Sequence, residues 1–259
     1  MTKEEQILSA TVQDRLRQAE RRGVPAHTGF LGPADLSTVE SVCLAAGLRP
    51  LDSAAEDFSG TGYILSGGCE DAERRICIIV PDGWKDAGCS AAFGDSRDRI
   101  AEAAGLFLCV LRISVPKGSR TLTHRDYLGA LLGLGVERSV IGDILVRKDG
   151  ADVIVLREMA EFFAAELSSV GKVCVNAGTA DLSELKAADQ HTEEYTDTVA
   201  SLRLDSVAAS AFRTARGRAQ EAVRQGLVFV NGRQVLKPDF ELSEGDRISL
   251  RGKGKAVLS

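Results

Sequence analysis

One stretch near the C-terminus, RGRAQEAVRQGLVFVNGRQVL at residues 216–236, decides the fold of the last part of the chain. Its first ten residues predict a helix, which Gly226 would end. An apolar strand follows and leads into Asn231-Gly232, a strong two-residue hairpin signal because both residues tolerate positive φ. The stretch therefore predicts a helix that feeds directly into a β-hairpin.

The flanking sequence completes a small module. Arg203-Leu204-Asp205 opens an amphipathic helix that continues to Ala211, and a break follows at 213–215. Glu244-Gly245-Asp246 predicts a turn before a closing strand at 247–251. Two helices and a small sheet are therefore expected over residues 201–259.

Two arginines stand at the start of the second predicted helix, at positions 216 and 218. A helix N-terminus favours anions, and acidic side chains would be preferred there for stability. Gly217 between them would let a polyanion backbone approach closely. The arrangement predicts a phosphate clamp, which Arg213, Arg224, Arg233 and Lys237 would broaden. The alternative is a solvated basic face.

The charge of the chain is divided unevenly. Residues 201–259 hold 11 Lys and Arg against 6 Asp and Glu, whereas residues 1–200 hold 21 against 31, which gives +5 and −10. The segment 181–200 is rich in acidic residues and is the best candidate for a linker. A basic module on an acidic chain indicates a localised polyanion site.

Composition excludes several classes of protein. With 259 residues, 44% hydrophobic and 27% charged, the chain is typical of a globular protein of two or three domains. It has no apolar run long enough to span a membrane, and its polar N-terminus does not resemble a signal peptide. Its six cysteines include no C-x-x-C pair, and its three histidines are far apart. We expect a cytoplasmic protein with reduced thiols, no metal and no cofactor.

The middle of the chain predicts a β-α-β-β-α-β order, the ferredoxin-like pattern shared by RNA-recognition domains. The expected elements are strands at 106–113, 143–146, 152–156 and 172–175 and helices at 124–134 and 157–170. Phe107 is the only aromatic residue in these strands, so a base-stacking platform is not expected. Before this region, helices at 7–19 and 35–46 and strands at 62–66 and 75–80 predict an N-terminal α/β domain.

The C-terminal module resembles the S4-type RNA-binding domain. The residues that carry the resemblance are Arg203-Leu204-Asp205, 215–220, 226–232 and 245–248, and the match covers about 57 residues. Ala215-Arg216-Gly217 departs from the Ser-Arg-Ser that the family favours, and so lacks the usual hydroxyl caps. The candidate RNA-binding residues here are Arg203, Arg213, Arg216, Gly217, Arg218, Gln220, Arg224, Asn231, Arg233 and Lys237.

The chain as a whole resembles the YlmH family of RNA-binding proteins. The segments 123–135 and 142–146 carry this resemblance, together with Gly67-Gly68 and Ala72-Glu73-Arg74. It implies a non-catalytic, monomeric protein that binds ribosomal RNA and tRNA on the large ribosomal subunit in ribosome-associated quality control. The family also includes members encoded beside cell-division genes and relatives in photosynthetic lineages.

The triplet His124-Arg125-Asp126 has two possible roles, one structural and one in RNA binding. It is not a kinase catalytic loop, because Leu131 stands where Asn is needed, and Gly133-x-Gly135 is no dinucleotide fingerprint. Either these residues cap a helix, or His124 and Arg125 contact RNA, as the resemblance favours.

We therefore expect an α+β protein of three small domains: an N-terminal α/β domain (1–82), a ferredoxin-like, RNA-recognition-like middle domain (83–180), an acidic linker (181–200) and an S4 domain (201–259). Two other functions remain open. One is an accessory to an RNA-modifying enzyme, although pseudouridine synthases carry the S4 domain at the N-terminus. The other is a protein adaptor in cell division or photosystem assembly.

Overall fold

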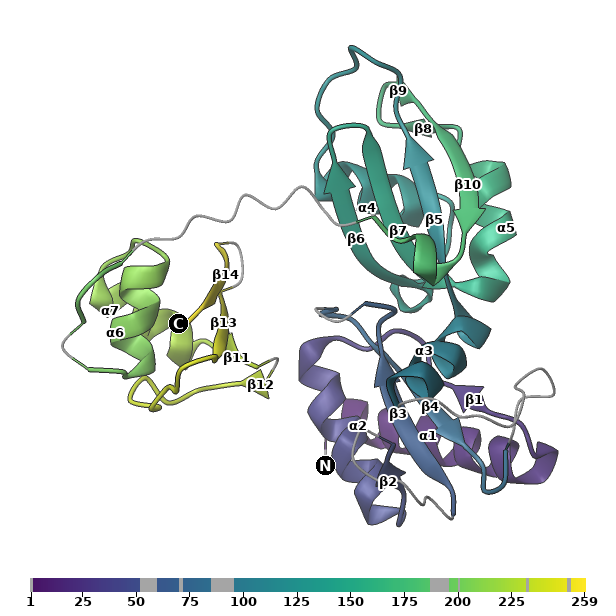
Figure 1. Ribbon diagram of the computed structural model, residues 1–259, viewed down its shortest axis with the longest axis horizontal. Coiled ribbons are helices and arrows are strands. Elements are labelled where there is room, and N and C mark those ends of the chain that lie inside the picture. The colour runs from purple at the N-terminus through teal and green to yellow at the C-terminus, as the bar shows by residue number, and fades with distance from the viewer. Residues whose placement is uncertain are drawn as a thin grey trace. The chain divides into compact units, whose positions relative to one another are not determined.

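The computed structural model describes residues 2–51, 60–69, 72–84, 96–186, 196–199, 201–231, 233–250 and 253–259. The chain divides into two compact units, Met1–Gln190 and His191–Ser259. It combines helices and strands in both units, which confirms the α+β class (Figure 1). No helix within the described residues is both long and apolar enough to cross a membrane.

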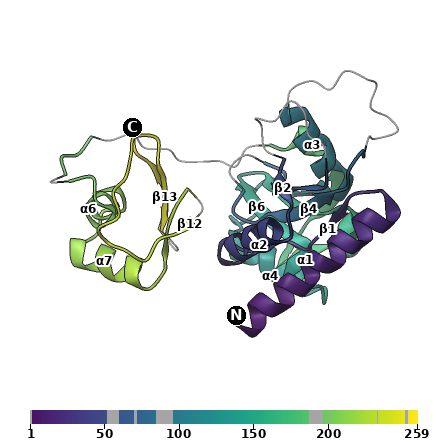
Figure 2. The same ribbon diagram turned by 90° about the horizontal axis from the view of Figure 1, so that it is seen from below.

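The first unit begins with a four-stranded sheet in the order β1-β4-β3-β2 (Ala26–His27, Ile76–Val80, Gly62–Ser66, Arg49–Pro50). The helices α1 (Lys3–Arg22) and α2 (Pro33–Ala45) cover one face of this sheet (Figure 2). Thr2 caps α1 through a capping box with Glu5, and Gly23 ends it at φ 66°. Both predicted helices and both predicted strands of this region are confirmed.

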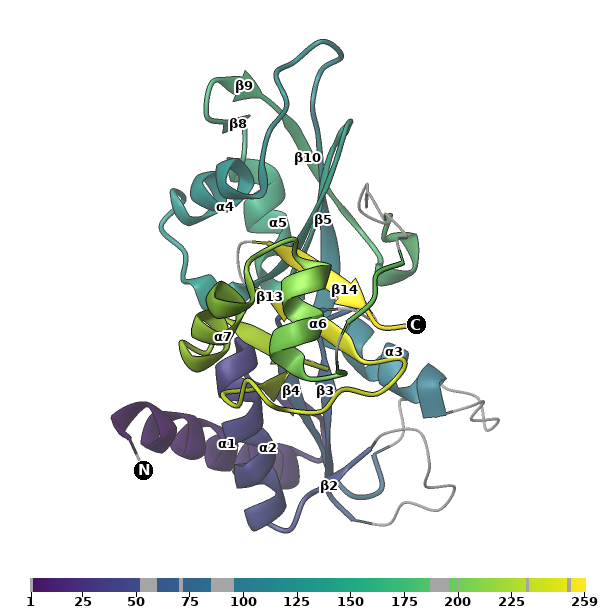
Figure 3. The ribbon, with the colours of Figure 1, turned by 90° about the vertical axis from the view of Figure 1, so that its left-hand side faces the viewer.

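The second half of this unit has the predicted β-α-β-β-α-β order. Its sheet runs β10-β5-β7-β6 (Asn176–Ala180, Leu108–Ser114, Gly150–Leu156, Ile141–Arg147) and is antiparallel throughout. The helices α4 (His124–Leu132) and α5 (Arg157–Glu166) lie on the same side of the sheet (Figure 3). Inward-facing residues such as Leu111, Val153 and Phe163 form a closed core between the helices and the sheet.

Three boundaries in this region were predicted wrongly. Leu106 and Phe107 end a helix, α3 (Ser96–Phe107), instead of starting the strand, because a short apolar run fits either structure. The helix α5 stops at Glu166, and Ser169–Val170 forms β8. The segment predicted as the fourth strand contributes only β9 (Val173–Cys174), which pairs with β8, and β10 takes its place in the sheet.

The two sheets of the first unit share a second core. Ile76 and Ile78 of β4 pack in one cluster with Ile154 and Leu156 of β7 and with α3. The strand β4 is buried along its whole length, which explains its uninterrupted Ile76-Cys77-Ile78-Ile79-Val80 sequence. The face of the middle sheet that points away from α4 and α5 is therefore packed against the N-terminal half.

The second unit contains the predicted helices α6 (Leu204–Ala211) and α7 (Arg216–Arg224) and a sheet in the order β12-β11-β13-β14. The strands span Arg233–Gln234, Val228–Val230, Arg247–Leu250 and Gly254–Val257. Asn231 has the positive φ, 50°, that the hairpin signal predicts. The last strand, β14, has no counterpart in the sequence prediction.

Candidate nucleic-acid interface

The start of α7 is tied to a buried aspartate. Arg216 donates from Nε to Oδ2 of Asp205 at 2.9 Å and from Nη2 to Oδ1 at 3.3 Å. Gln220, one turn further along α7, donates from Nε2 to the same Oδ2 at 2.6 Å. Arg203 forms a longer ion pair, 3.7 Å from Nε to Oδ1. Three predicted site residues therefore converge on one carboxylate.

Asp205 itself is fully buried, whereas the Arg216 side chain is 51% exposed. Burial alone would raise the pKa of Asp205, but the hydrogen bonds from Arg216 and Gln220 outweigh it and the pKa lies below its ordinary value. The carboxylate is thus ionised and holds the Arg216 guanidinium in one orientation, with its outer part in solvent. Sequence reasoning noted Asp205 only as part of a motif and missed this positioning role.

Other predicted residues of this module stand in solvent. Arg213, Arg218, Arg224 and Lys237 are exposed, and Arg213 connects α6 and α7 with a φ of 46°. Gly217 is exposed too, and a Cβ built there would meet no atom within 4 Å. Nothing in the described protein therefore requires a glycine at this helical position, where it costs about 1 kcal/mol relative to Ala.

The hairpin carries two further predicted residues, Asn231 and Arg233. The Asn231 side chain donates to Asp246 at 2.8 Å and accepts from the backbone N–H of Arg247 at 3.0 Å, so it joins the hairpin to the neighbouring strand β13. Arg233 lies in β12, but its side chain is outside the described residues. At the entry of α7, Ala215 makes no side-chain cap, in agreement with the departure seen in the sequence.

The middle sheet offers no open platform for bases. Arg112 and Asp152, which face away from α4 and α5, form a bidentate ion pair with Nη2 to Oδ2 at 3.0 Å. The segment 181–186, expected as the start of a linker, lies over them. Arg112 donates to the Glu184 carbonyl in η2 (Leu182–Glu184), and the Lys186 N–H donates to Asp152. Together with the shared core, this segment covers the face that an RNA-recognition domain would use for stacking.

The helix α4 begins as predicted. Thr123 and Asp126 form a capping box, so Asp126 serves the cap while His124 and Arg125 are exposed. Loss of hydration around the ring and the nearby charge of Arg138 both lower the pKa of His124, against smaller opposite effects of Asp143 and Glu73. His124 is therefore neutral near pH 7, and it can donate a hydrogen bond or stack but adds little charge.

Two motifs that are far apart in the sequence meet at the junction of the two halves of the first unit. Asp143 accepts hydrogen bonds from the backbone N–H groups of Glu73 at 2.6 Å and Arg74 at 3.1 Å. Arg74 in turn donates to the carbonyls of Phe30 and Ile141. These residues join the halves, so their role in the structure is architectural.

The described residues contain no cluster of His, Cys, Asp and Glu that could hold a metal ion. Cys43, Cys77 and Cys109 are buried, whereas Cys174 is exposed. Cys89 lies outside the described residues.

Comparison with known families defines the class of protein. The family model described as "Putative RNA-binding domain in YlmH" matches residues 104–184, and the S4 domain model matches residues 202–248. The first match falls on the middle sheet with α4 and α5, and the second on the Asp205–Arg216 module. The fold and these matches define an RNA-binding protein that carries an S4 domain after a YlmH-type domain.

Individual relatives narrow the class. Over 207 residues the chain is 34% identical to ribosome-associated protein quality control protein P2 of Bacillus subtilis, covering 80% of this chain and 75% of that protein. The chain therefore belongs to the YlmH family. A segment of 55 residues, 21% of this chain, is 42% identical to small ribosomal subunit protein uS4 of Desulfotalea psychrophila, where it covers 26%. The solved structure of cell division protein ylmH from Streptococcus pneumoniae aligns with a TM-score of 0.49 at 18% identity, covering 71% of this chain and 95% of that one.

Proposed function

We propose that this protein is a non-catalytic factor of ribosome-associated quality control that binds ribosomal RNA, with tRNA beside it, on the large ribosomal subunit. In this proposal it acts in the cytoplasm as a monomer. Its relative in Bacillus subtilis carries that process in its name. The RNA would be held by the S4 domain.

The observation that carries the proposal is the surface around α7. Arg216 is held by a buried carboxylate with its outer part in solvent, and Arg218 and Arg224 are exposed on the same helix. Gly217 leaves open space beside them. A fixed guanidinium, exposed guanidinium groups and a bare backbone position suit close contact with phosphates. The net charge of +5 on residues 201–259 supplies the matching field.

The test measures the affinity of the full chain and of a 201–259 fragment for deproteinised large-subunit ribosomal RNA across a range of salt concentrations. Three to four phosphate contacts, at roughly 0.7–0.9 each, predict a slope of about −3 in log affinity against log salt. A flat titration would refute RNA binding by this module.

A double variant locates the surface. Arg218→Glu with Arg224→Glu is expected to abolish binding to the RNA and to large subunits. The matched control is Arg21→Glu with Arg22→Glu, which makes the same change in net charge at exposed positions of α1. Equal binding by both double variants would contradict the assignment of the site to α7.

The RNA-modification alternative predicts a different result. Deleting the gene would then change a modified base in ribosomal RNA, which mass spectrometry of digested RNA detects. Loss of ribosome association without any modified-base change supports the binding role.

A further inference from the structure

The sheet of the middle domain is covered on both faces, so an RNA contact of this domain lies elsewhere on its surface. One face of the sheet is packed against α4 and α5, and the other against the N-terminal half and the segment 181–186. The outer surface of α5 is acidic, with exposed Glu158, Glu161 and Glu166. Besides the start of α4, with its exposed His124 and Arg125, the loops at the far end of the domain remain among its described surfaces.

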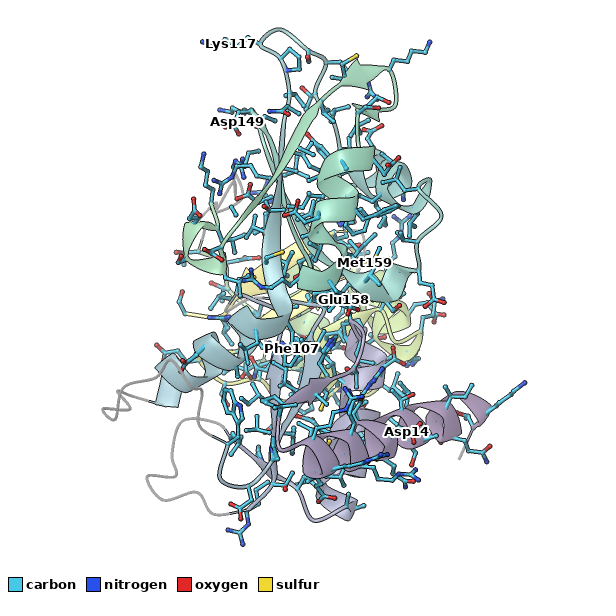
Figure 4. All side chains as sticks on the ribbon, turned by 90° about the vertical axis from the view of Figure 1, so that its right-hand side faces the viewer. Asp14, Phe107, Lys117, Asp149, Glu158 and Met159 are labelled. Atoms are coloured by element: carbon cyan, nitrogen blue, oxygen red, sulfur yellow. The ribbon has the colours of Figure 1, made fainter. Side chains whose placement is uncertain are left out.

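Those loops bring together lysines from three separate parts of the chain. Lys117 lies in the loop after β5, Lys148 in the β6–β7 turn and Lys172 in the β8–β9 turn, and all three are exposed. Figure 4 shows Lys117 at the outer end of its loop, with Asp149 on the neighbouring turn. We call this surface the distal loops, comprising residues 115–120, 147–149 and 171–172.

Contacts between the loops fix them as one surface. The Val115 N–H donates to the Asp149 carbonyl at 3.0 Å. Lys117, Gly118 and Ser119 line a hollow of about 290 Å³ together with Lys148 and Asp149. On the other side, the Arg120 guanidinium lies 3.1 Å from the position that a Cβ of Gly171 would occupy, next to Lys172.

The balance of charge on this surface is positive. Arg147 pairs with Asp149 at 2.9 Å and with the buried Asp152 at 2.8 Å, and Arg120 pairs with Asp126, outside these loops, at 3.1 Å. By formal charge, five basic residues against Asp149 give the distal loops a net charge of +4, on a unit whose overall charge is negative. None of the exposed large apolar side chains of the described residues lies on the distal loops, so the surface lacks the anchors of a protein interface.

We propose that the distal loops are a second RNA-binding surface, which contacts the phosphate backbone without reading bases. The proposal rests on the proposed function of the chain as an RNA-binding protein, and it adds a surface on the middle domain to the S4 domain. Lysine suits this role because it binds phosphate as a point charge with no demand on base identity. Two RNA contacts on one chain raise the effective concentration of each for the other.

The test uses full-length protein with Lys117→Ala, Lys148→Ala and Lys172→Ala combined. Two controls accompany it: the same three positions changed to Arg, and Arg17→Ala with Arg21→Ala and Arg22→Ala on α1. The probes are purified large ribosomal subunits and their deproteinised RNA, each titrated over a range of salt concentrations. Circular dichroism checks that every variant is folded.

The alanine variant is expected to bind both probes about tenfold more weakly at 0.1 M salt, with a salt slope shallower by about two. The arginine variant and the α1 variant should behave like the unmodified protein. An unchanged salt slope in the alanine variant overturns the proposal. The proposal is also overturned if this variant binds large subunits more weakly but binds the deproteinised RNA with unchanged affinity, because that result would indicate a ribosomal protein as the partner. If the Arg218→Glu, Arg224→Glu variant still loses binding in either case, the proposed function stands without the distal loops.

Discussion

Reversing the charge of Arg216 is expected to destabilise the C-terminal unit, whereas the same change at Arg218 should leave it folded. Arg216 makes two hydrogen bonds to the fully buried carboxylate of Asp205. A glutamate there would remove both and place a second negative charge beside Asp205. Arg218 is exposed, and none of the described residues forms an ion pair with it.

The magnitude follows from burial. Breaking a fully buried ion pair by removing one partner costs about 3–5 kcal/mol. The Arg216 side chain is 51% exposed, so water replaces part of the interaction, and Gln220 still donates to the carboxylate. We therefore expect a loss of about 2 kcal/mol for Arg216→Glu, and less than about 0.5 kcal/mol for Arg218→Glu, as for other exposed positions.

Hydrogen–deuterium exchange of the full chain measures this loss within one unit. A loss of about 2 kcal/mol corresponds to roughly 30-fold faster exchange of the most protected amides, expected in β11 and β13. Peptides from β5 and β7 of the first unit serve as an internal control. Unchanged protection in Arg216→Glu would refute the role of Arg216 in holding Asp205. For the same reason, a variant that combines Arg216→Glu with Arg218→Glu would mix folding with RNA binding.

Two further predictions concern the helix α4. Because the pKa of His124 is lowered, its side chain is neutral near pH 7 and gains a positive charge only in more acidic solution. The loss of RNA affinity caused by His124→Ala with Arg125→Ala should therefore increase as the pH falls from 7.5 to 5.5. A double variant that binds RNA like the unmodified protein at every pH would leave both residues with a capping role alone. The pKa of Asp126 is lowered to about 2 by hydrogen bonds from the Thr123 backbone, the Arg120 side chain and the Thr123 hydroxyl. The stability that ionised Asp126 adds at the helix start is therefore fully present above its unfolded pKa of 3.8, and it is lost as the pH falls toward 2. Carbon-13 NMR titration of the carboxyl group should give a midpoint near 2, and a midpoint near 3.8 would contradict the hydrogen-bonded cap.

The elements with strong local signals were predictable because their causes are local. Thr123 and Asp126 satisfy the first turn of α4, and Asn231 supplies the positive φ of its hairpin, whatever surrounds them. The order of strands and helices in the middle domain follows from hydrophobic spacing in the same way. Where the signal was only a short apolar run, as at Leu106 and Phe107, helix and strand were equally compatible with it.

The candidate site was predicted as a set of residues, but its organisation was not. Sequence reasoning took Arg216 from the start of a predicted helix and added Arg203 and Gln220 by family resemblance. It treated their side chains as equivalent to those of Arg218 and Arg224. The structure separates them, because the first three bond to Asp205 and the last two do not. That difference depends on how α6 and α7 pack, and spacing along one helix carries no information about the charge on its neighbour.

The sequence by itself determined the classes of local structure, the basic character of the last 59 residues and the absence of aromatic residues needed for a stacking sheet. Only the tertiary structure decided what each surface of the first unit can do. In the folded unit, the face of the middle sheet that points away from α4 and α5 packs against Ile76 and Ile78 and lies under the segment 181–186. Three lysines from turns that are distant in the sequence lie at one end of the domain. The physical reason is that burial and charge proximity are properties of residues brought together across the chain, whereas propensity, capping and turn chemistry act between neighbours.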